Sequence, residues 1–110
     1  MRLDYKDTKL RKLCENSREA SRKLGANSAK KLISRLEDIV AASSIEGLPP
    51  VGDPHPLHHD REGQFSIGLA GGNRLVFEPT DQPAPVRESG GIHWGQVTAV
   101  TIIFIGDYHD

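Results

Sequence analysis

The side chains best suited to proton transfer or phosphate binding fall in three short stretches of this 110-residue chain. The first, "DPHPLHHDREGQFSI" at 53–67, holds three of the five histidines, and "DYHD" forms the last four residues. Histidine titrates near neutral pH and can move a proton in either direction, while a nearby carboxylate can orient its ring. Between these stretches lies Arg74, whose planar guanidinium suits phosphate. Proton transfer beside a phosphate is one interpretation; a polar tail and a surface arginine are the alternatives.

The histidine-rich stretch also raises the question of a metal site, because imidazole and carboxylate bind zinc or nickel. His58 and His59 are neighbours and would point apart in an extended segment, and no second ligand pair follows at a recognisable distance. The single cysteine, Cys14, falls on the apolar side of an expected helix and is expected in the core. No glycine-rich phosphate loop is present, since "GLAGG" precedes an expected strand. We therefore expect neither a metal nor another cofactor.

Composition indicates a globular protein, with 36% apolar and 26% charged residues. One cysteine excludes an internal disulfide, and no apolar run approaches the roughly 18 residues of a membrane span. No secretory signal is evident, so we expect no membrane association and a cytoplasmic protein.

The charge is unevenly distributed along the chain. Residues 1–40 carry eleven basic and six acidic side chains, a net of +5, whereas residues 41–110 have a net of −6. This asymmetry is typical of a basic face for nucleic acid or an acidic partner, or of a solvated helical surface.

Periodicity predicts the elements that must position these residues. "RLDY" at 2–5 alternates and predicts a short strand. Apolar residues at helical spacing predict one helix from about residue 7 to 24 and a second from about 27 to 42. Gly25 separates them, so we expect an antiparallel helical hairpin.

The second half of the chain predicts a sheet. "QFSIGL" and "RLVFE" flank the turn "AGGN" and predict a β-hairpin over 64–78. A long surface loop is expected at 79–96, followed by the most apolar strand at 97–105, which we expect at the centre of the sheet. The order β-α-α-β-β-β predicts a single α+β domain over 1–110, with the helical hairpin packed on a mainly antiparallel sheet.

Three stretches in this order resemble a known protein family. "HPLHHDREGQFSI", "GGNRLVFE" and a strand ending in "IFIGDYH" resemble the RelE/ParE superfamily of bacterial toxins, and within it the HigB (plasmid-maintenance killer) branch. Typical members carry His-Pro-Leu-Lys-Gly-Asp-Arg-x-Gly-Tyr/Phe-x-Ile, an Arg-hydrophobic-x-Phe strand and a terminal Asp-Tyr-His. The resemblance implies a RelE-like fold with a twisted, mainly antiparallel sheet, and the order of elements above agrees with it.

The resemblance also implies an activity and partners. Such toxins are ribosome-dependent mRNA endonucleases of type II toxin–antitoxin pairs, in which the 2′-OH attacks the adjacent phosphate without a metal. A HigA-like helix-turn-helix antitoxin would neutralise the toxin, with a heterotetramer as one arrangement, and the ribosome and mRNA would be the other partners.

Residue roles follow from the same resemblance. Arg74 would stabilise the phosphate charge, His109 would transfer a proton, Tyr108 would position or stack on a base, and Asp107 would orient the reacting group. His58 occupies the place of the family's usual lysine, and we expect it to act in catalysis there as a cation or proton donor. We further expect three residues in the first strand of the hairpin, or just before it, to contact RNA: Arg61, His59 and Phe65.

The chain departs from the family pattern in ways that leave other functions open. His58 and His59 replace a Lys-Gly pair, the loop 79–96 is long, and the net charge of −1 is low for a ribosome-binding protein. A catalytically weakened toxin fold that binds an antitoxin or another protein is therefore the alternative function. A ParE-like action on DNA gyrase is a third.

Overall fold

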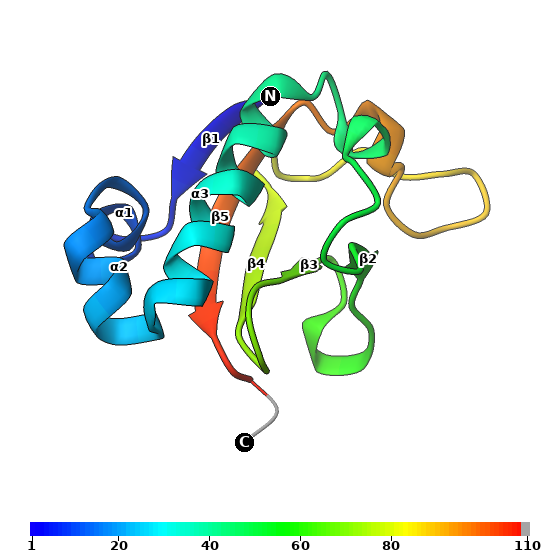
Figure 1. Cartoon of the computed structure of the whole chain (residues 1–110). Helices are drawn as coiled ribbons and strands as arrows, with labels where there is room; N and C mark the ends of the chain where they lie inside the picture. The colour runs from blue at the N-terminus through cyan, green and yellow to red at the C-terminus, as the bar shows by residue number, and fades with distance from the viewer. Residues whose placement is uncertain (109–110) are drawn as a thin grey trace.

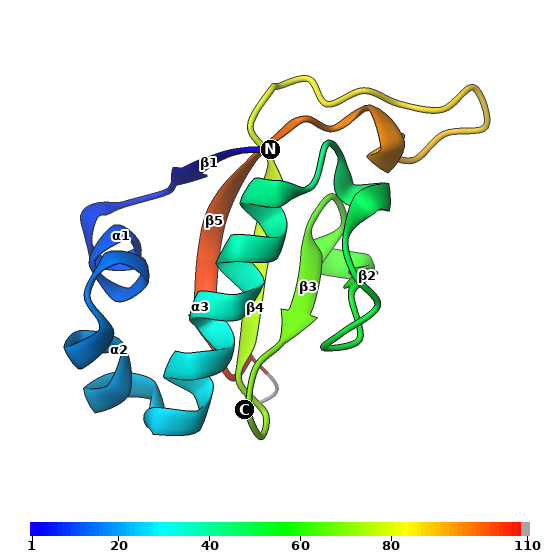
Figure 2. The same ribbon diagram turned by 45° about the horizontal axis from the view of Figure 1, so that its top comes forward.

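The computed structural model describes residues 1–108. Figures 1 and 2 show α3 lying along one face of a sheet, with α1 and α2 beside β1. The helices are α1 (Thr8–Glu15), α2 (Ser17–Leu24) and α3 (Ala26–Ala41). The strands are β1 (Arg2–Tyr5), β2 (His55–Pro56), β3 (Phe65–Gly68), β4 (Arg74–Pro79) and β5 (Ala99–Gly106). Three 3-10 turns complete the list: η1 (Ile45–Gly47), η2 (His59–Arg61) and η3 (Trp94–Gln96).

The sheet has the order β1-β5-β4-β3-β2. β1 runs parallel to β5, and the other neighbours are antiparallel. The α+β prediction is confirmed, and the arrangement is consistent with a RelE-like fold. Two details differ from the prediction. The middle strand is β4, although β5 is also interior, and the two-residue β2 adds a fifth strand on the outer side of β3.

The expected first helix is divided in two at Asn16, so the prediction of one continuous helix was wrong. Asn16 has an extended backbone with φ −125° and ψ 103°. Its N–H donates to the Lys12 carbonyl, ending α1, and its side-chain oxygen accepts from the Glu19 N–H at 3.1 Å, starting α2. An asparagine side chain competes with helical backbone bonding and favours such caps. The predicted hairpin is retained between α2 and α3, which meet at Gly25 with φ +87°.

The hydrophobic core lies between α3 and the sheet. Leu32 and Ile39 from α3 are buried with Leu75, Phe77 and Ile102 from β4 and β5, each at 0 or 1% exposure. Burying a side chain of this size contributes about 1.5–3 kcal/mol. The core therefore fixes which face of the sheet is covered and which is left for function.

Cys14 packs at the edge of this core from α1, as the sequence predicted. It is partly buried. Burial, with a smaller contribution from the charge of Glu15, raises the pKa of its thiol to about 12. Cys14 is therefore a neutral thiol at physiological pH.

A register shift in β5 changes the direction of the side chains that follow it. Val76 pairs with Phe104 while the next residue, Phe77, pairs with Ile102, so Ile103 is an extra residue in β5. One inserted residue reverses the alternation of side chains beyond it. Ile102 therefore faces the core and Phe104 faces the opposite side.

The loop expected at 79–96 begins one residue later, because Pro79 ends β4 and pairs with Val100. The remainder, 80–96, lies outside the five strands but has structure of its own. Val86 and Ile92 form an isolated bridge, and Trp94 in η3 packs edge-on against Phe65 with centroids 5.1 Å apart. Figure 2 shows this segment extending beyond the β2 and β3 side of the sheet. The loop is thus anchored to the core by its single tryptophan.

Candidate functional site

A buried serine organises the sheet face opposite α3. Ser66 lies between the core residues Phe65 and Ile67 in β3, so its side chain points to the other face. Ser66 is fully buried, and its Oγ accepts a hydrogen bond from Arg74 Nε at 2.8 Å. The Tyr108 hydroxyl lies 3.5 Å from the same Oγ. The serine therefore joins β3, the first residue of β4 and the segment after β5.

Two nitrogens of the Arg74 guanidinium group are held in place by hydrogen bonds. Besides the bond to Ser66, its Nη2 donates to the Asp53 carbonyl at 3.3 Å. Gly68, the residue paired with Arg74, provides space beside the group, because a Cβ there would lie 3.0 Å from Nη1. Arg74 is partly exposed, so this fixed cation can still receive an anion.

His55 stands next to Arg74 on the same face. Its Nδ1 lies 2.7 Å from the Asp53 carbonyl oxygen, 3.6 Å from an Asp53 carboxylate oxygen and 3.5 Å from Arg74 Nη2. A carbonyl oxygen can only accept, so the short contact places a proton on Nδ1 and makes the Arg74 contact a non-bonded one. The tautomer leaves Nε2 as a proton acceptor in a side chain that is 41% exposed.

Two aromatic rings and a second arginine extend the cluster. The guanidinium carbon of Arg61 lies 4.7 Å from the ring centroid of Tyr108 and 5.4 Å from that of Phe104. The two rings meet edge to face at 6.1 Å. Gln64 accepts a hydrogen bond from Arg61 at 3.1 Å. Cation–π contacts of this kind contribute about 0.5–1 kcal/mol when exposed. We call this set the sheet-face cluster: His55, Arg61, Ser66, Arg74, Phe104 and Tyr108.

The predicted site residues separate into those the fold brings together and those it does not. Arg74, Tyr108 and Arg61 meet in the sheet-face cluster. Asp107 is exposed at the β3–β4 turn, where a Cβ on Gly72 would overlap its carboxylate. His109 lies outside the described residues.

The remaining predicted residues have other surroundings. His58 is exposed and lines a separate pocket, and His59 is exposed in η2 with φ +61°. Phe65 is only 7% exposed and stacks on Phe77 at 5.4 Å. The ring of Phe65 therefore packs in the core and presents little surface to a ligand.

The sequence patterns assigned no role in the site to Ser66 or to His55. A signal for Ser66 was present, because the "AGGN" turn pairs Gly68 with Arg74 and so puts Ser66 and Arg74 on one face. The position of His55 had no comparable signal. It depends on β2, whose two residues lie in a proline-rich connection.

No metal site is evident in the part of the chain that the structure describes. Across residues 1–108, no three histidine, cysteine, aspartate or glutamate side chains are grouped to hold a metal ion. Over the same residues, no helix has the length and apolar character needed to cross a membrane.

Comparison with known proteins places the chain in a family. No protein-family model matches it. Toxin YoeB of Streptomyces coelicolor is 34% identical over 56 residues, which cover 51% of this chain and 67% of that toxin. This similarity does not select the HigB branch that the motifs resemble. It agrees with the fold and with the ordered motifs, and the chain belongs to the RelE/ParE-type superfamily of toxin–antitoxin toxins.

Proposed function

We propose that this protein is the toxin of a type II toxin–antitoxin pair and acts as a ribosome-dependent mRNA endonuclease. The observation that carries the proposal is the sheet-face cluster, in which Ser66 holds Arg74 beside Tyr108 and next to His55. Membership of the toxin superfamily supports it, as does the similarity to Toxin YoeB.

Cleavage of RNA by this route uses only side chains of the protein and the 2′-OH of the substrate. The ribose 2′-OH attacks the adjacent phosphorus, the bond to the 5′-oxygen breaks, and the products are a 2′,3′-cyclic phosphate and a 5′-hydroxyl end. A base must remove the 2′ proton, an acid must protonate the leaving oxygen, and a cation must stabilise the pentacoordinate phosphorane. Arg74 is the fixed cation, since its guanidinium is already oriented before substrate binds.

Two histidines are assigned the proton transfers. His55 presents Nε2 from the same face as Arg74, with Nδ1 committed to the Asp53 carbonyl, and this geometry suits a base. His109 keeps the proton-transfer role that the family motif gives it, as the acid. Tyr108, stacked under Arg61, supplies an aromatic surface for a base next to the cleaved bond.

The partners follow from the family. A toxin of this superfamily has a cognate antitoxin, which we propose to be a HigA-like helix-turn-helix protein. The strand and loop half of the chain carries net negative charge, so free RNA would bind weakly through phosphates. Presentation of mRNA by the ribosome in the cytoplasm would provide the missing affinity.

The test is induced expression in a bacterium, with and without the antitoxin, followed by mapping of mRNA 5′ ends. We expect growth arrest with cleavage at fixed positions within codons, and loss of both in an Arg74→Ala variant. Arg18→Ala, an exposed arginine in α2, is the matched control and should cleave like the wild type. Growth arrest without codon-linked cleavage would instead favour a toxin-fold protein that acts by binding.

A further inference from the structure

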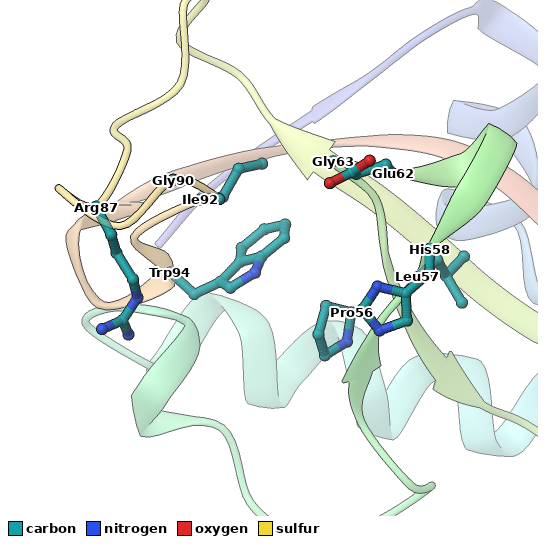
Figure 3. A pocket seen from close by; sticks show the side chains of 10 residues that line it. Pro56, Leu57, His58, Glu62, Gly63, Arg87, Gly90, Ile92 and Trp94 are labelled. Carbon is teal, nitrogen blue, oxygen red and sulfur yellow. The ribbon is translucent and has the colours of Figure 1, made fainter.

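A second concave site lies on the other side of the edge strand β2. It is a pocket of about 370 Å³ between the β2–η2 segment and the loop that carries Trp94. Figure 3 shows the indole of Trp94 in the middle of the lining, with Arg87 on one side and His58 and Pro56 on the other. The proposed cleavage chemistry uses none of these four residues.

The two residues of β2 connect this pocket to the sheet-face cluster. His55 pairs with Ser66 and Pro56 pairs with Phe65, so their side chains point to opposite faces of the sheet. His55 belongs to the cluster, whereas Pro56 lines the pocket. The same division continues beyond β2, where His58, just before η2, lines the pocket and Arg61, the last residue of η2, stacks on Tyr108. A single strand therefore separates the two sites.

The loop side of the pocket is ordered by its own hydrogen bonds. The Arg87 N–H donates to the Gly91 carbonyl at 2.9 Å, and the Gly90 N–H donates to the Arg87 carbonyl at 3.0 Å. Trp94 is held edge-on by Phe65, which is itself part of the core. An aromatic ring and an arginine are thus presented on a fixed frame rather than on a free loop.

We propose that this pocket binds an unpaired nucleobase of the RNA, and that this base lies close along the RNA chain to the phosphate held at Arg74. The inference rests on the proposed function for the identity of the RNA. An indole ring offers a flat surface on which any base can stack, and Arg87 and His58 offer cationic or hydrogen-bonding groups for the backbone. Glu62, which also lines the pocket, offers an acceptor for an exocyclic amino group. An RNA chain that crosses β2 would place one nucleotide on each side of this β-strand.

The chain contains one tryptophan, so its fluorescence reports on this pocket directly. We would titrate the full-length His55→Gln protein, in which Arg74 is retained and cleavage should be slowed, with a hexaribonucleotide of alternating adenosine and uridine and follow Trp94 emission. Quenching that saturates is expected. Adding Arg87→Ala should raise the dissociation constant about fivefold or more, as expected for loss of an exposed cationic contact. It should also reduce the slope of log affinity against log salt by about 0.7 if one phosphate contact is lost.

The Arg18→Ala change in the same background is the matched control, because Arg18 is an exposed arginine on α2, away from the loop. It should leave the dissociation constant unchanged. Absence of quenching, or equal affinity with and without Arg87, overturns the inference. A change in Trp94 emission with purified antitoxin and none with RNA also overturns it and assigns the pocket to a protein.

Failure of this inference can be distinguished from failure of the proposed function. If the wild type cleaves mRNA in cells and Arg87→Ala cleaves the same positions at the same rate, the base-binding pocket is excluded while the nuclease remains. If RNA quenches Trp94 and this depends on Arg87 but no cleavage occurs, the pocket is an RNA-binding site and the nuclease proposal fails.

Discussion

The guanidinium carbon of Arg61 lies 4.7 Å from the ring centroid of Tyr108. This contact joins the η2 turn to the segment that follows β5, and the edge-to-face contact of Tyr108 with Phe104 supports it from the strand. The stacking therefore positions Tyr108, and with it the start of the Asp-Tyr-His motif, relative to Arg74.

Arg61→Ala should impair cleavage by releasing Tyr108. We expect ribosome-dependent cleavage to fall about 5- to 30-fold, corresponding to about 1–2 kcal/mol of lost positioning. The free energy of unfolding in urea should fall by only about 1 kcal/mol, since Arg61 is half-buried and its ring contacts are weak. Arg61→Lys should recover only part of the activity, because an ammonium lacks the planar face that stacks on a ring. Single-turnover cleavage on programmed ribosomes is the measurement, and equal activity of Arg61→Ala and the wild type would contradict the role of this contact.

His55→Gln tests the proposed base. The glutamine side chain can still donate to the Asp53 carbonyl, but it cannot accept a proton, so Arg74 should remain in place while chemistry slows. We expect the cleavage rate at saturating substrate to fall about a hundredfold or more, with binding of the ribosome complex little changed. A fall in the cleavage rate of less than about threefold would show that His55 is not the base in this reaction.

Gly52→Ala should destabilise the fold. Gly52 has φ +79°, and a Cβ there would lie 2.7 Å from the Gly68 carbonyl oxygen and 2.9 Å from Arg35 Nε, two groups that are themselves hydrogen-bonded at 3.2 Å. We expect the free energy of unfolding in urea to fall by about 2–4 kcal/mol through backbone strain and displacement together.

Gly71→Ala is the control for this effect. Gly71 also has a positive φ, +60°, but a Cβ there would meet nothing within 4 Å. Its cost should therefore be the backbone strain alone, about 1–2 kcal/mol. Equal destabilisation by the two variants would show that the space around Gly52 is not restrictive.

Cys14 should react slowly in the folded protein. Burial raises the pKa of its thiol from the ordinary 9.0 to about 12, so the reactive thiolate is scarce at pH 8. We expect a disulfide reagent to modify Cys14 at least about a hundredfold more slowly in the native protein than in urea.

The same shift predicts a pH dependence of stability. A raised pKa in the folded state means that the stabilisation is complete below pH 9 and is lost as pH rises towards 12. Cys14→Ala should weaken this alkaline loss in urea titrations. An equally steep loss in the variant would assign it to other groups.

The sequence by itself determined the class of fold and the place of Arg74 within it. Alternation of apolar residues predicted β3 and β4 as a hairpin, and the turn between them placed Arg74 at the start of a strand. These patterns are local, because the spacing of the apolar residues and the identity of the turn residues can be read from neighbouring positions in the sequence. The ordered motifs identified the toxin superfamily for the same reason.

The tertiary structure alone decided which side chains share a face. The extra residue at Ile103 turns Phe104 away from the core, and β2 brings His55, rather than His58, to Arg74. A one-residue shift reverses a strand's faces, yet its position depends on pairing with a distant strand and on the packing of both sides. Most residues of β5 are apolar and could face either side of the sheet. Which of them face the core therefore depends on the pairing and packing of the assembled sheet.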